Sequence, residues 1–237
     1  MGRINTLYLH IGTHKTGTTS IQHFLLDEAC ALARNGLEFF VGRRPKRNGK
    51  IDRLGNAWLL ADQFLRKDLL TIMRLKHAEE RGFIPARPME KDRLRKLIVS
   101  SRCTQFLVSA ESFCMARTAQ ELIHLKKYFA LIECDVVPII CFRNTDDWRA
   151  SFNNELVGMK YFGPTVAALP VHQRVDGDWY YSRAEIFAFW NQIGTVRTID
   201  YDFAMAQEGS VIPSFMRAIE RSCIKSSKDY LLNRRRP

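Results

Sequence analysis

The chain has 237 residues, of which 46% are hydrophobic and 11% aromatic, so it can bury the core of a globular domain at the upper end of common sizes. Its apolar runs are far shorter than the roughly 20 residues of a membrane-spanning helix, and its first residues lack a leader-peptide pattern. We therefore expect a cytoplasmic protein without a transmembrane segment. The net charge of +11 favours an anionic partner, which could be nucleic acid, an anionic membrane surface or a polyanionic small ligand.

The six cysteines support the same location. They show no CxxC pair and no zinc-type spacing, so reduced, mostly buried thiols are expected.

A βαβ unit is predicted at the start of the chain. Residues 6–11 (TLYLHI) are apolar and β-prone, and a glycine-containing loop follows them. Apolar residues at helical spacing predict a helix from about Thr18 to the sequence RNG at 34–36, and residues 37–41 (LEFFV) predict the next strand. This order is typical of a parallel sheet.

Residues 42–104 are harder to assign. They begin with a basic, turn-rich segment and continue into helical patterns such as that of residues 57–75. Two interpretations stay open: a solvated loop with a covering helix, or an acceptor-facing insertion that carries positive charge. The basic residues of the segment are Arg43, Arg44, Lys46, Arg47 and Lys50.

Strands and helices alternate through the rest of the chain. Strands are predicted at 104–111, 136–144 and 195–201. Apolar faces predict a helix after each of the first two strands, another at 183–194 and a last one from 210. We predict one α/β domain over residues 1–237, a three-layer α/β/α fold around a mainly parallel sheet, with residues 42–104 inserted.

The loop LHIGTHKTGTTS, residues 9–20, has the composition of an anion site. Backbone N–H groups at a glycine loop that enters a helix attract anions, and the helix dipole adds to this. In the NTPase motif GxxxxGK[ST] a lysine follows the second glycine, but Thr18 stands there in this chain. A tight turn without a ligand is the alternative. The residues that give backbone freedom or N–H, hydroxyl and ammonium donors are Gly12, Lys15, Thr16, Gly17, Thr18, Thr19 and Ser20.

A second anion site is predicted after the strand at 136–144. Arg143 stands at the end of this strand, and Ser151 follows eight residues later. Arginine is a strong bidentate partner of phosphate, and a hydroxyl two helical turns along can complete the site. Taken alone, a strand-end arginine is more often part of a salt bridge.

These segments resemble a known family. HIGTHKTGTTSIQHFL is similar to the 5′-phosphosulfate loop of the sulfotransferases that use 3′-phosphoadenosine 5′-phosphosulfate (PAPS), and VVPIICFRNTDDWRAS is similar to their 3′-phosphate site. Residues 178–219 are similar to the C-terminal pattern of the family. The resemblance leaves 42–104 unmatched. It implies a P-loop sulfotransferase fold, PAPS as co-substrate, 3′,5′-ADP (PAP) as product and no metal.

The resemblance also implies residue roles. Arg143 and Ser151 would bind the 3′-phosphate, and Lys15 would also stabilise the departing oxygen. The general base in the family is a glutamate or a histidine. Glu111, at the end of a predicted strand, is the leading candidate, Glu38 is the second, and His14 beside the loop's lysine stays open, with His10 a weaker choice. The residues expected to bind the 5′-phosphosulfate are Gly12, Thr13, His14, Lys15, Thr16, Gly17, Thr18, Thr19 and Ser20.

The predicted activity is transfer of a sulfonate group to a hydroxyl or amine of a small-molecule or glycan acceptor. The basic insertion suggests an anionic glycan or a lipid headgroup. A P-loop kinase is the first alternative, but the chain lacks its lysine and a Walker B strand. A non-catalytic nucleic-acid-binding domain would explain the charge but not the two anion sites, so no nucleic acid is expected. The third alternative is a degenerate sulfotransferase that binds the nucleotide but does not turn it over. The oligomeric state is not indicated.

Overall fold

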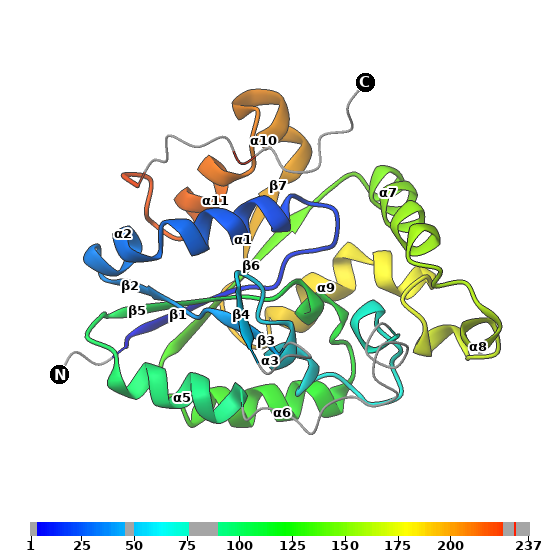
Figure 1. Cartoon of the computed structure of the whole chain (residues 1–237), viewed down its shortest axis with the longest axis horizontal. Helices are drawn as coiled ribbons and strands as arrows, with labels where there is room; N and C mark the ends of the chain where they lie inside the picture. The colour runs from blue at the N-terminus through cyan, green and yellow to red at the C-terminus, as the bar shows by residue number, and fades with distance from the viewer. Residues whose placement is uncertain (1–3, 46–49, 76–89, 225–229, 231–237) are drawn as a thin grey trace.

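A parallel sheet forms the centre of the computed structural model, which describes residues 4–45, 50–75, 90–224 and 230 (Figure 1). The strand order is β2-β5-β1-β6-β7, and every pairing is parallel. Because β2 and β5 lie on one side of β1 and β6 and β7 on the other, the carboxyl end of β1 is the switch point at which ligands bind in such sheets. The strands are β1 (Thr6–His10), β2 (Leu37–Phe39), β5 (Gln105–Ser109), β6 (Asp135–Phe142) and β7 (Arg197–Asp200).

Helices cover both faces of the sheet, which confirms the predicted three-layer α/β/α fold (Figure 1). Side chains alternate along each strand, so that Tyr8 packs on one face and Leu7 and Leu9 on the other. The first face is covered by α1 (Thr18–Asp27), α2 (Ala29–Arg34) and α11 (Ile212–Ala218). The second is covered by α5 (Glu90–Ser100), α6 (Ala119–Ala130) and α9 (Arg183–Trp190).

Most of the long helices begin at a polar cap, but α1 does not. Thr118 forms a capping box with Glu121 at α6, Asn144 caps α7 (Thr145–Gly158), and Asp200 caps α10 (Tyr201–Glu208). Helix α1 instead follows Gly17, whose φ of 74° is left-handed, and has no side-chain cap. Its first N–H groups therefore stay available to a ligand.

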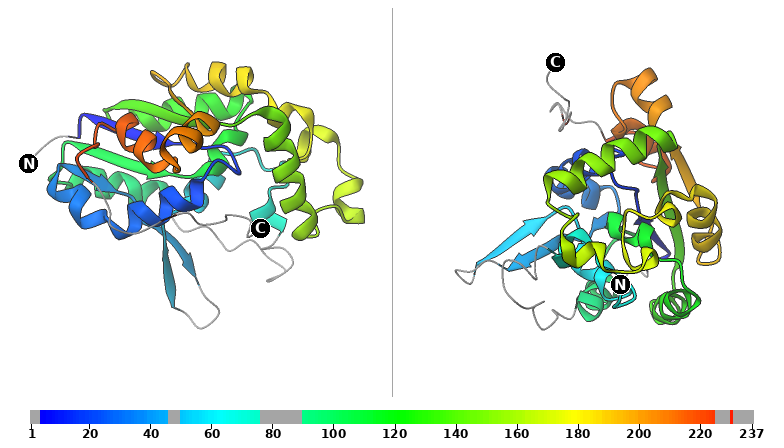
Figure 2. Two further views of the ribbon diagram at one scale, coloured as in Figure 1. Left: turned by 90° about the horizontal axis from the view of Figure 1, so that it is seen from above. Right: turned by 90° about the vertical axis from the view of Figure 1, so that its right-hand side faces the viewer.

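The described residues at the start of the segment 42–104 form regular structure that the sequence does not indicate. Its basic start forms an antiparallel hairpin, β3 (Gly42–Pro45) and β4 (Ile51–Leu54), which extends from the body of the molecule (Figure 2). The prediction of a loop was wrong for these strands; Lys46 and Arg47 lie outside the described residues. Helix α3 (Trp58–Asp62) follows.

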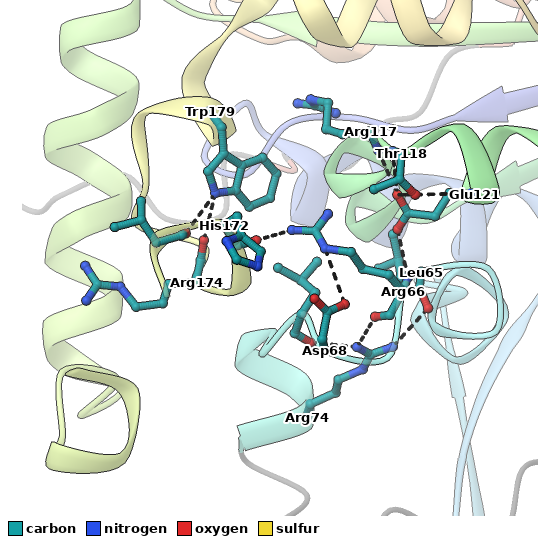
Figure 3. Close-up of polar contacts among 12 residues, drawn as sticks. Leu65, Arg66, Asp68, Arg74, Arg117, Thr118, Glu121, His172, Arg174 and Trp179 are labelled. Carbon is teal, nitrogen blue, oxygen red and sulfur yellow. Dashed lines mark hydrogen bonds and ion pairs between the residues drawn. The ribbon is translucent and has the colours of Figure 1, made fainter. Parts of the chain in front are cut away.

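The residues after α3 are bound to a distant part of the chain (Figure 3). The backbone N–H of Leu70 donates to the carbonyl of Gln173 over 2.8 Å, and the Trp179 ring lies 5.1 Å from the Arg66 guanidinium. This distant part includes α8 (Pro164–Ala167) and two 3-10 turns at Val171–Gln173 and Asp178–Tyr181.

Within the described residues, no helix is both long and apolar enough to cross a bilayer. All six cysteines are free, but only Cys114 and Cys141 of them are buried, so the expectation that most of the thiols are buried was wrong. The extent of the single domain over 1–237 stays a prediction.

Candidate functional site

The loop between β1 and α1 has an unusual backbone. Gly12, Lys15 and Gly17 have φ angles of 45°, 67° and 74°. The left-handed conformation costs a residue with a side chain about 1–2 kcal/mol, so the strain at Lys15 must be offset by its surroundings. A Cβ at Gly12 would lie 2.8 Å from Cγ2 of Thr18, and only glycine fits there.

Two threonines of the loop use their hydroxyls to hold its shape. The Thr13 hydroxyl donates to the carbonyl of Cys141 on β6 over 2.8 Å, and that of Thr16 donates to the carbonyl of Thr13 over 2.6 Å. Both side chains are fully buried. The hydroxyl-donor role predicted for Thr16 does not fit this arrangement; its backbone N–H is the group it can offer. Ser20 is buried, and Thr19 is exposed.

Lys15 and Ser151 lie along one wall of the site. The Lys15 Nζ is 3.6 Å from Oε2 of Glu155 on α7. Ser151 precedes Glu155 by four residues on the same helix, so the two share a face, and that face is turned toward the loop.

Arg143 lies beside the same loop. It follows β6 directly, and the Cys141 carbonyl two residues earlier binds Thr13. Its guanidinium carbon is 5.5 Å from the centre of the Tyr201 ring, and Cε2 of that ring would lie 3.4 Å from a Cβ on Gly17. Tyr201 thus connects Arg143 to the loop.

The Nε atom of Arg143 is buried and has no hydrogen-bond partner among the described residues. It forms an ion pair with Oδ1 of Asp202 at 3.7 Å, the kind of contact expected of a strand-end arginine, but this distance is too long for a hydrogen bond. A buried donor without a hydrogen bond is costly. A phosphate oxygen is a partner that would satisfy this guanidinium.

Glu111 is brought to the loop, and Glu38 is not. Glu111 follows β5, accepts the Thr18 hydroxyl at Oε2 and accepts Nδ2 of Asn56 at Oε1 over 3.4 Å. Glu38 pairs in register with Phe106, three residues before Ser109, which places it about 10 Å back along the strand. It also faces away from Leu37 and Phe39, which pack on the α1 side. Of the two glutamates, Glu111 is therefore the one that lies at the loop.

His14 is held by a side-chain cluster. Its Nδ1 forms a hydrogen bond with the Tyr180 hydroxyl, and its ring centre lies 4.8 Å from the centre of the Phe152 ring. The Sγ atom of Cys114 lies 3.8 Å from the Tyr180 hydroxyl. Burial raises the pKa of Tyr180 well above its ordinary value, so the phenol keeps its proton. Tyr180 is therefore free to donate to His14.

His10 lies beneath the loop. Its Nδ1 is 2.8 Å from Oγ of Ser109, and the side chain is fully buried. Burial lowers the pKa of His10 to about 3, so the imidazole is neutral at ordinary pH. An enclosed, neutral ring of this kind supports the loop and is not placed to take a proton from an acceptor.

The sequence did not indicate which residues contact and position the predicted site residues. The partners come from separate segments and form no motif with the loop. They are Asn56, Cys114, Glu155, Tyr180 and Tyr201.

Gly17→Ala tests the packing of the loop. The new Cβ would lie 2.7 Å from Cγ1 of Val211, and φ would stay at 74°, so we expect a loss of about 2–4 kcal/mol in the free energy of unfolding. Gly209→Ala is the matched control, because its φ is 67° but nothing lies within 4 Å of the new Cβ. Urea denaturation of both variants measures the difference. Equal losses would show that Val211 does not constrain the loop.

Comparisons with known proteins give a likeness in fold. No protein-family model and no curated protein matches the chain. A solved sulfotransferase from Alicyclobacillus acidocaldarius superposes with a TM-score of 0.54 at 16% identity, over 99% of this chain and 87% of that one. The sulfotransferase domain from the curacin biosynthetic pathway gives 0.43 at 14% identity, over 93% and 74%. The chain therefore has the α/β fold of the first of these sulfotransferases.

Proposed function

We propose that this chain is a sulfotransferase that moves a sulfonate group from PAPS to a hydroxyl or amine of an acceptor. The observation that carries the proposal is the meeting of two anion sites at one edge of the sheet. The uncapped helix α1 with Lys15 forms the first, and Arg143, whose buried Nε makes no hydrogen bond with the described residues, forms the second. PAPS carries anionic groups at the 5′ and 3′ positions of its ribose, which matches the two anion sites.

The first-turn N–H groups of α1 and Lys15 would hold the 5′-phosphosulfate, and Arg143 with Ser151 would hold the 3′-phosphate. The acceptor oxygen attacks sulfur, the bond from sulfur to the 5′-phosphate oxygen breaks, and PAP leaves with the electron pair. Lys15 stabilises the negative charge on that oxygen. Glu111 takes the proton of the acceptor. These residues act mainly by position and charge.

A kinase fits the site less well. An NTPase lysine would follow Gly17, but Thr18 stands there and its hydroxyl donates to Glu111. A nucleic-acid surface would leave the enclosed loop and the Arg143 site unused.

Ligand-induced thermal shifts test the proposal. PAP should raise the melting temperature, and ATP with Mg²⁺ should raise it much less; stabilisation by ATP–Mg²⁺ alone would overturn the proposal.

Arg143→Gln tests the 3′-phosphate site. The loss of a charged hydrogen bond worth about 1.5–3 kcal/mol should weaken PAP binding about 10- to 100-fold, with adenosine 5′-phosphosulfate nearly unaffected. The control is Arg149→Gln, which removes a partly exposed arginine of α7 that pairs with Asp178. Titration calorimetry measures both ligands. An equal loss for the two would contradict the role assigned to Arg143.

A further inference from the structure

The β3–β4 hairpin carries positive charge that the fold does not use. Arg43 lies directly opposite Arg53, and both side chains are exposed and make no hydrogen bond or ion pair with the described residues. Residues directly opposite share one face of the hairpin, and like charges in that position are destabilising. The hairpin also stands apart from the body, with the Ile51 side chain 55% exposed (Figure 2). A role in stability therefore does not explain the arginine pair.

The root of the hairpin is fixed by close backbone packing. A Cβ at Gly42 would lie 2.0 Å from the Asn56 carbonyl oxygen, and one at Gly55 would lie 2.2 Å from the carbonyl oxygen of Gln22 on α1. Ala57, the residue after Asn56, donates its backbone N–H to the Ser109 carbonyl over 2.8 Å. The hairpin is thus anchored both to α1 and to the carboxyl end of β5.

The same root reaches the candidate base. Asn56 lies between the hairpin and α3, and its Nδ2 contacts Glu111. Arg53 precedes Asn56 by three residues, so the arginine pair begins within about 10 Å of chain from the residue that contacts the carboxylate. The root of the hairpin therefore lies next to Glu111.

We propose that the face of Arg43 and Arg53 binds a polysaccharide acceptor that carries carboxylate or sulfate groups and presents one of its hydroxyls to Glu111. The inference rests on the proposed function and names its acceptor class. Guanidinium groups bind planar carboxylates and sulfates through paired hydrogen bonds, so two arginines side by side suit a chain of repeated anionic groups.

The composition of the hairpin favours a polysaccharide over two other polyanions. Residues 42–55 contain no Phe, Tyr or Trp, whereas proteins that bind single-stranded nucleic acid stack bases on such rings. Among the described residues of the hairpin, Ile51 is the one large exposed apolar side chain, which is too little to enter a bilayer.

Fluorescence anisotropy with a labelled oligogalacturonate tests the proposal directly, without PAPS. The double variant Arg43→Glu/Arg53→Glu should bind at least about tenfold more weakly than the native chain at 0.1 M salt, because two attractive contacts become repulsive. The control is Lys126→Glu/Lys127→Glu on α6, which changes the net charge by the same amount at exposed positions outside the hairpin. It should bind nearly as the native chain does.

Several results would overturn the proposal. Equal losses in the two double variants would show that net charge, not the hairpin, attracts the oligosaccharide. Equal binding of an uncharged maltooligosaccharide would remove the role of charge. A larger loss toward single-stranded DNA or phosphatidylserine vesicles than toward oligogalacturonate would assign the hairpin to that partner instead.

The two proposals fail separately. If the native chain showed no thermal shift with PAP, the sulfotransferase proposal would fall whatever the hairpin binds. If PAP stabilised native and hairpin-variant chains alike but oligogalacturonate did not bind the native chain, only the acceptor class would be wrong.

Discussion

Replacing Lys15 with methionine is expected to lower kcat/KM for the proposed sulfonate transfer about 10³-fold, because the loop would lose the cation to which the proposal assigns stabilisation of the departing oxygen. The side chain keeps its length, so the change removes the charge and little volume. The pairing of Lys15 with Glu155 is at 3.6 Å and partly exposed, and such pairs contribute little to stability. The melting temperature should therefore stay close to that of the native chain, while steady-state kinetics show the loss.

Lys160→Met is the matched control for this variant. Lys160 is an exposed lysine whose φ of 55° is also left-handed, so the two substitutions carry similar backbone strain. It lies after α7 and outside the loop, and its kinetics should not change. If Lys15→Met kept transfer within a few-fold of the native rate, Lys15 would not be the group that stabilises the leaving oxygen.

The arrangement of the layers could be predicted because it depends on local patterns. Strands such as that of residues 136–144 are short apolar runs between helices with one apolar face, and parallel sheets follow from this order. The loop and Arg143 could be placed at the same edge for the same reason. Both follow strands directly, and parallel strands end at one edge.

The length of α3 could not be predicted, since a buried side chain decides it. The helical pattern of residues 57–75 continues past Asp62, where α3 ends. Arg74 binds Oδ1 of Asp62 over 2.6 Å and donates to the carbonyl oxygens of Arg66 and Leu69. These carbonyls would otherwise accept bonds within a continuous helix. Figure 3 shows the Arg74 guanidinium beside Leu65 and Arg66. Arginine in this role has no sequence signal.

The choice between Glu111 and Glu38 also needed the structure. Both follow or occupy apolar strands, and the sequence gives no register between β2 and β5. The pairing of Glu38 with Phe106 places it short of the carboxyl edge, whereas Glu111 lies beyond Ser109 and contacts the loop.

Glu111→Gln is expected to lower kcat by about 10²- to 10⁴-fold, because an amide cannot take the proton of the acceptor. The new side chain would keep an oxygen to accept the Asn56 amide, and the Thr18 hydroxyl can rotate to accept from the introduced NH₂ group. The fold and PAP binding should therefore change little. The same kinetics on Glu38→Gln provide the control, and this variant should remain as active as the native chain.

The melting temperatures of the two variants separate catalysis from structure. If Glu111 served only to hold Thr18 and Asn56, Glu111→Gln would lower the melting temperature and leave kcat nearly unchanged. If Glu38 were the base, Glu38→Gln would lower kcat and Glu111→Gln would leave it nearly unchanged. A large loss of kcat together with a retained melting temperature in Glu111→Gln, and neither in Glu38→Gln, is the result expected only if Glu111 is the base.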